Sequence, residues 1–150
     1  MNNIKKSTLQ IIEAYKTAVF DKNVDAFINL YSKDVRVFDA WGAWSYDSLE
    51  SWRKMVGEWF ASLGNERVQV DFDEIRAMDE QELTIVTSIV TYAAYSAGDN
   101  SLRALQNRLT WLLKPEGGAV KIVHEHTSVP VDFDDKKAIL LREHKSSSAR

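Results

Sequence analysis

The hydrophobic period of this chain changes at Glu66 from about 3.6 residues to two. Before that point, apolar residues recur at helical spacing. After it, Val68, Val70 and Phe72 alternate with polar residues, as in a strand with one buried face. Because most helices precede most strands, the chain cannot form a regular series of βαβ units. The pattern predicts an α+β fold with a curved, mostly antiparallel sheet.

Local signals place the individual elements. Asn23 can cap a second helix, Asp47 and Glu50 have the spacing of a capping box for a third, and Gly64 ends that third helix. The predicted helices are 7–20, 23–31 and 47–63, and the predicted strands are 35–38, 66–73, 83–95, 102–114 and 119–129. Asp134 can cap a further short amphipathic helix through Ile139, Leu140 and Leu141.

Composition limits the classes of function. The net charge is −3, with 19 basic and 22 acidic residues interspersed, so we expect neither nucleic acid nor a membrane surface as partner. The chain has no cysteine, which excludes disulfides, thiolate metal sites and a cysteine nucleophile. Glu13 and Lys16 interrupt the first apolar stretch, so we expect no signal peptide and a cytoplasmic protein. The 150 residues predict one domain, with a core over about 7–130 and a terminal helix and tail over 131–150.

The strand 102–114 has two unlike faces. Gln106, Arg108 and Thr110 form the polar face, which we expect to face a cavity under the helices. The other face is apolar and carries Leu105, Leu109, Trp111 and Leu113. We expect a second copy of the chain to cover it, which predicts a homodimer.

A turn of four residues, 115–118, would place Arg108 opposite Glu125. His124 and His126 would then lie on the apolar side, whereas a slip of one residue would turn both into the cavity. The sequence does not choose between these registers. No third ligand stands at a suitable spacing, so we expect no metal site.

Asp39 lies between Phe38 and Trp41 at the exit of a predicted strand. Burial beside aromatic rings would raise the pKa of this carboxyl group toward the range of a general base. The alternative is a turn aspartate whose oxygens accept hydrogen bonds from backbone amides.

Two segments resemble a known family: Tyr31-Ser-Lys-Asp-Val-Arg-Val-Phe-Asp39 and Ile122-Val-His-Glu-His-Thr-Ser128. Together they resemble the SnoaL-like branch of the nuclear transport factor two-like superfamily, over roughly Ser7 to Pro130. Ketosteroid isomerases and the association domain of calcium/calmodulin-dependent kinase belong to this superfamily. The resemblance implies a cone-shaped curved sheet with three N-terminal helices on its concave face.

The resemblance also implies roles for residues. Asp39 matches the aspartate that moves the substrate proton in ketosteroid isomerases, and Tyr15 matches the oxyanion-hole tyrosine. Thr110 stands where those enzymes have a protonated aspartate, and Trp59 where they have a pocket tyrosine. The pocket would be walled by Trp41, Trp59, Phe60 and Tyr92.

The resulting hypothesis is a cofactor-independent isomerase, cyclase or dehydratase that abstracts a proton from a carbon acid. The alternative is a non-catalytic ligand-binding or oligomerisation module. In that case Arg108 would hold a small carboxylate, with Glu125, His124 and His126 as further candidate ligand contacts.

Overall fold

The computed structural model describes residues 3–143, in which three helices and five strands follow one another. They are α1 (Lys6–Phe20), α2 (Val24–Ile28), β1 (Tyr31–Phe38), α3 (Leu49–Ser62), β2 (Arg67–Glu80), β3 (Leu83–Tyr95), β4 (Ser101–Glu116) and β5 (Ala119–Ser128). These three helices and five strands follow one another in the predicted order. None of the helices in residues 3–143 is long and apolar enough to cross a membrane.

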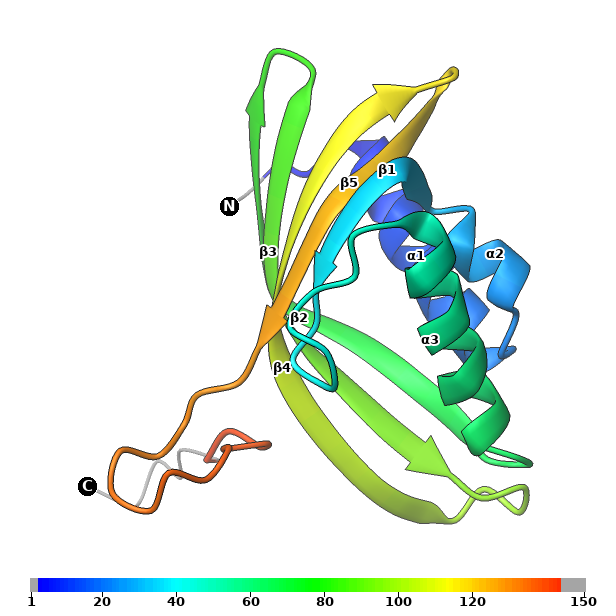
Figure 1. The fold of residues 1–150 in the computed structure, drawn as a ribbon, viewed down its shortest axis with the longest axis vertical. Helices are drawn as coiled ribbons and strands as arrows, with labels where there is room; N and C mark the ends of the chain where they lie inside the picture. Colours follow the sequence, from blue (N-terminus) through cyan, green and yellow to red (C-terminus); the bar gives the residue numbers. More distant parts are fainter. Residues whose placement is uncertain (1–2, 144–150) are drawn as a thin grey trace.

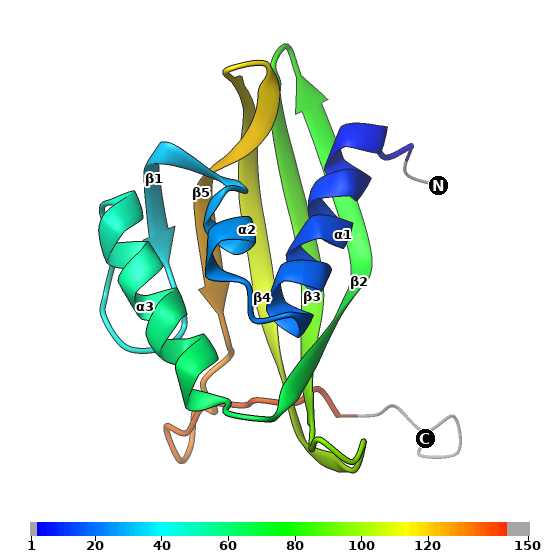
Figure 2. The ribbon, with the colours of Figure 1, turned by 90° about the vertical axis from the view of Figure 1, so that its right-hand side faces the viewer.

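The strands form one sheet in the order β1-β5-β4-β3-β2. β1 runs parallel to β5, and the other neighbours are antiparallel. The sheet curves around α1, α2 and α3, which lie on its concave face (Figures 1 and 2). This confirms the predicted α+β fold with a curved, mostly antiparallel sheet and three N-terminal helices.

The core fills the space between these helices and the sheet. The ring of Phe27 from α2 lies near its centre, 5.0 Å from the ring of Tyr15, 5.3 Å from that of Tyr31 and 5.7 Å from that of Phe60. Large aromatic side chains contribute most of the apolar area that such a packing removes from water. The short α2 is therefore held by its contacts with α1, α3 and β1 rather than by its own length.

The predicted faces of β4 are wrong. Leu109, Trp111 and Leu113 are buried under the helices, and Trp111 packs 5.6 Å from the ring of Tyr15. Arg108 is exposed on the opposite, convex side, where its guanidinium group donates a hydrogen bond to Ser128. The three bulky apolar residues are needed to fill the core, so they do not form a free face for a second copy.

The turn between β4 and β5 explains part of this error. Gly117 and Gly118 both have positive φ, 59° and 80°, and form a two-residue turn, so Glu116 pairs with Ala119. A register shift at Leu112 and Leu113 then places Trp111, rather than Arg108, opposite Glu125. A bulge of this kind adds one residue to one strand and changes which side chains share a face.

The predicted helix through Ile139 and Leu141 is also absent. Residues 129–143 form a turn and an isolated bridge between Val131 and Ala138. β5 ends at Ser128 while β4 continues, and the amide of Gln106 donates to the carbonyl of Leu140 at 2.7 Å. The extended segment thus satisfies an edge of β4 that a helix would leave unpaired. The predicted tail from residue 145 lies outside the described residues.

Candidate functional site

A cavity of about 430 Å³ lies between the helices and the concave face of the sheet. Its walls are mostly apolar and include Phe27, Trp41, Trp52, Met55, Trp59 and Leu63. Pockets for small organic ligands have this size and composition, with few polar groups to orient the ligand. The polar groups of this cavity come from α1, the loop after β1, β3, β4 and β5.

Six of the predicted site residues line this cavity: Tyr15, Asp39, Trp41, Trp59, Tyr92 and Glu125. They come from distant parts of the chain and are brought together because α1 and α3 cross the concave face. The aromatic residues among them were predicted from the family resemblance. Glu125 was predicted as a candidate ligand contact opposite Arg108, but Trp111 and not Arg108 lies opposite it.

The other five predicted residues lie elsewhere. Arg108 and Thr110 belong to the convex face, because the odd-numbered residues of β4 point toward the helices. His124 and His126 also lie on the convex side, where both rings pack against Phe38. Phe60 is buried in the core beside Phe27.

The two histidines therefore lie outside the cavity and contact β1. Nδ1 of His124 lies 2.6 Å from the carbonyl oxygen of Arg36 on β1. Among residues 3–143, no three His, Cys, Asp or Glu side chains are grouped as ligands for one metal ion.

Asp39 points into the cavity from the loop that follows β1. Its Oδ1 accepts a hydrogen bond of 2.9 Å from the hydroxyl of Thr127, which in turn accepts one from the amide of Ala40. Burial raises the pKa of Asp39 above its ordinary value, while the contacts with Thr127 and the amides of Trp41 and Ala40 act in the opposite direction. The net direction is the one that we predicted for a carboxyl group beside aromatic rings.

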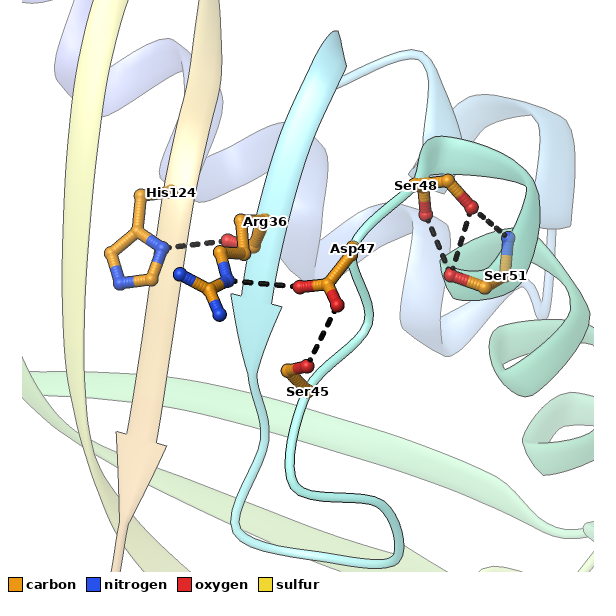
Figure 3. A network of polar contacts seen from close by, with 6 residues as sticks. All are labelled: Arg36, Ser45, Asp47, Ser48, Ser51 and His124. Atoms are coloured by element: carbon orange, nitrogen blue, oxygen red, sulfur yellow. Dashed lines mark hydrogen bonds and ion pairs between the residues drawn. The ribbon is translucent and has the colours of Figure 1, made fainter.

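The loop that carries Asp39 is fastened at its base. Val37 and Tyr46 exchange two backbone hydrogen bonds of 2.9 and 2.8 Å. Arg36 and Asp47 form an ion pair at 2.9 Å, and Asp47 also accepts from the hydroxyl of Ser45 (Figure 3). Since Asp47 is held here, the cap of α3 is not Asp47, as predicted, but the next residue, Ser48. The loop is thus closed like a hairpin, with Asp39 at one end.

Two tyrosine hydroxyl groups meet in the wall of the cavity. The Tyr15 and Tyr92 hydroxyl oxygens lie 2.8 Å apart. Burial raises the pKa of both phenols, so both remain protonated near neutral pH. One of the two protons is used within the pair. The other can be donated to a ligand oxygen or to the side chain of Asn107, which contacts the Tyr92 hydroxyl.

Glu125 is a buried carboxyl group in the wall of the cavity, with 2% of its surface exposed. Its Oε1 accepts hydrogen bonds from the Tyr31 hydroxyl at 2.6 Å and the Trp111 indole at 2.9 Å. Burial raises the pKa of Glu125 to about 7, against the effect of these two hydrogen bonds. The group is therefore protonated in a substantial fraction of molecules at neutral pH.

Among the cavity residues that were not predicted, three carry polar side-chain groups: Trp52, Arg103 and Asn107. Asn107 lies on the same face of β4 as Leu109 and contacts the Tyr92 hydroxyl. Its Oδ1 and the Trp52 indole nitrogen are the enclosed side-chain polar atoms without a hydrogen-bond partner in the described part of the chain. A polar Asn within the apolar face of β4 was the sequence signal, and the wrong face assignment concealed it.

A concave sheet covered by helices, with a mostly apolar cavity between them, defines the nuclear transport factor 2-like class of fold. A family model for the SnoaL-like domain matches residues 9–132, and the chain belongs to this family. No curated protein sequence matches the chain.

Several solved structures share the fold. An NTF2-like protein of unknown function from Pseudomonas putida KT2440 is 20% identical, with 91% of this chain and 94% of that chain covered and a TM-score of 0.79. Aln2 from a Streptomyces species is 9% identical, with coverage of 81% and 87% and a TM-score of 0.72. A protein from Xanthomonas campestris, provisionally assigned as a calcium/calmodulin dependent protein kinase II association domain, is 14% identical, with coverage of 81% and 84% and a TM-score of 0.64. At these identities the likeness concerns the fold alone.

Proposed function

We propose that the protein is a cofactor-independent enzyme that abstracts a proton from a carbon acid, with Asp39 as the base. The observation that carries this proposal is the position of Asp39. Its carboxyl group faces an apolar cavity, and burial raises the pKa of this group. It has no cationic partner among the described residues. A carboxylate is a stronger base in such surroundings than in water, which suits removal of a proton from a weakly acidic carbon.

The Tyr15 and Tyr92 hydroxyl groups would stabilise the product of that step. Abstraction of a proton beside a carbonyl group leaves negative charge on the carbonyl oxygen. The hydroxyl proton that is not used within the tyrosine pair can donate a hydrogen bond to this oxygen, and the hydrogen bond between the two phenols strengthens the donor. Asn107 of β4, which lines the cavity, would be the second hydrogen-bond donor in the role that we predicted for Thr110.

A second candidate function is binding of a carboxylate ligand without catalysis. It is favoured by Arg103, which lines the cavity and forms an ion pair with Glu66 at 2.6 Å. Arg103 would hold the ligand carboxylate, the role that we predicted for Arg108. Under this alternative Asp39 would hold the loop and would not react.

The test uses benzylacetone, a ketone with an aromatic ring that suits the cavity walls. Exchange of its acidic C–H protons in heavy water is followed by proton NMR with the wild type, the Asp39→Asn variant and the Asp71→Asn variant. Asp71 lies exposed on β2, so its variant controls for the same change of charge away from the cavity.

We expect the wild type and Asp71→Asn to accelerate exchange and Asp39→Asn to lose at least about 100-fold of that acceleration. Ligand affinity, measured through fluorescence of the cavity tryptophans, should change by less than about tenfold. Equal exchange rates in Asp39→Asn and the wild type would exclude Asp39 as the base. Binding without exchange in the wild type would favour the second candidate.

A further inference from the structure

Glu125 is a second carboxyl group in the cavity, and the proposed proton abstraction does not use it. Its hydrogen bonds are asymmetric, because the Tyr31 hydroxyl and the Trp111 indole both donate to Oε1. Oε2 has no hydrogen-bond partner among the described residues. It is not among the enclosed atoms that lack a partner, which are in Trp52 and Asn107, so it remains open to the cavity.

This asymmetry fixes the place of the acid proton. An oxygen that accepts two hydrogen bonds has little capacity to carry a proton of its own. The proton of the neutral acid therefore sits on Oε2, and the only direction in which it can be donated is into the cavity. The acid proton of Glu125 therefore faces the cavity.

Glu125 also lies close to Asp39. Oδ1 of Asp39 binds Thr127, and Thr127 is two residues from Glu125 on the same face of β5. Two such residues are about 6.6 Å apart along a strand. Two carboxyl groups in one apolar site cannot both ionise easily, which favours one as a carboxylate and the other as an acid.

We propose that Glu125 is the general acid of an elimination reaction, in which the substrate is a β-hydroxy carbonyl compound and water is the leaving group. This inference rests on the proposed role of Asp39. The Asp39 carboxylate takes the proton from the carbon beside the carbonyl group, and the electron pair of that C–H bond forms the enolate. The enolate electrons then form the C=C bond while the β C–O bond breaks.

The leaving oxygen takes the proton from Oε2 of Glu125 and departs as water. Asp39 ends protonated and Glu125 ionised, and proton transfer through solvent restores both groups. A simple isomerisation would need only one such residue, since the base can return the proton that it has removed. A departing hydroxide ion, by contrast, needs an acid to protonate it.

The experiment compares two reactions on two probes. Proton exchange of benzylacetone needs only the base. Elimination from the aldol adduct of benzaldehyde and acetone to benzylideneacetone, followed by ultraviolet absorbance, needs the base and the acid. The variants are Glu125→Gln, which keeps an acceptor for Tyr31 and Trp111, and Glu82→Gln, which makes the same change at an exposed residue of the β2–β3 turn.

We expect Glu125→Gln to lower the ratio of the elimination rate to the exchange rate by at least about 100-fold, and Glu82→Gln to leave this ratio at the wild-type value. In the wild type the elimination rate should fall as pH rises through the pKa of Glu125, whereas exchange should not. The titratable groups around Glu125 are Tyr31 from β1, Asp39, Tyr15 from α1 and Tyr92 from β3, and the three phenols stay neutral over this range.

The outcomes separate the two proposals. No exchange in the wild type would end the role of Asp39 and this inference with it. Exchange without elimination in the wild type would overturn the elimination and leave proton abstraction standing. An unchanged ratio in Glu125→Gln, with a melting temperature close to that of the wild type, would remove Glu125 as the acid.

Discussion

At the scale of single residues, the site depends on polar groups placed in an apolar cavity. Tyr15 was predicted from the resemblance to ketosteroid isomerases, and Asp39 from that resemblance and from its position between Phe38 and Trp41. Asn107 was missed because a strand has two faces, and the choice between them depends on what the helices bury. The buried face of the strand is therefore set by tertiary packing and cannot be determined from the sequence of the strand alone.

The burial of Glu125 predicts a dependence of stability on pH. Its pKa rises from an ordinary 4.5 to about 7, so between these values the folded state binds more protons than the unfolded state. The contribution of Glu125 to stability is therefore complete below about pH 4.5 and is lost as pH rises to about 7, at a cost of about 3 kcal/mol. Glu125→Gln cannot ionise and does not show this loss. Its free energy of unfolding should therefore rise relative to that of the wild type as pH increases over this interval. Urea denaturation from about pH 4.5 to 8 checks this, and a constant difference between the two proteins would contradict it.

The tyrosine pair makes a further prediction for catalysis. Tyr15→Phe removes one hydroxyl and leaves that of Tyr92 without its partner. Loss of an oxyanion donor should lower benzylacetone exchange by roughly 100-fold, mostly in the maximal rate rather than in the Michaelis constant. Steady-state exchange kinetics measure both quantities. A change confined to the Michaelis constant would assign the pair to ground-state binding.

At the scale of elements, the helices and the number of strands could be predicted, while the register of the last hairpin could not. Helical stripes and alternating strands are local patterns of the sequence. The β4–β5 register depends instead on the two-residue glycine turn and on the shift at Leu112 and Leu113. The sequence from Pro115 to Gly118 is equally compatible with a four-residue turn, and no local pattern predicts the register shift. The prediction of a C-terminal helix failed for a similar reason, because the Gln106 amide at the edge of β4 donates to the carbonyl of Leu140.

The loop of Asp39 yields a prediction at this scale. Gly42 has a φ of +76°, and an added Cβ atom would lie 3.1 Å from the Tyr46 hydroxyl oxygen. Gly42→Ala should therefore lower the free energy of unfolding by about 1–2 kcal/mol and reduce proton exchange, because the loop that positions Asp39 must shift. Gly57→Ala is the control: Gly57 lies within α3 with open space around it, so this change should stabilise by about 0.5–1 kcal/mol. Denaturant unfolding of both variants decides, and equal stabilisation by both would contradict the strain at Gly42.

At the scale of the whole molecule, the fold and the family follow from the sequence, but the assembly does not. The homodimer was predicted from an apolar face of β4 that the structure places under α1. Dimerisation stays a prediction and needs another part of the surface. Sedimentation at micromolar concentration would support it with a species of twice the chain mass of 17.1 kDa, and a species of 17.1 kDa would end it.

The central claim is that the Asp39 carboxylate, made more basic by burial, removes a proton from a carbon acid in the cavity. The measurement that tests it most directly is the rate of benzylacetone proton exchange across pH, for the wild type and Asp39→Asn. Since the base must be ionised, the wild-type rate should rise with pH through a pKa above the ordinary 3.8 of an aspartate. Asp39→Asn should lack this rise and stay near the rate in buffer. The same rise at the same rate in Asp39→Asn would contradict the account.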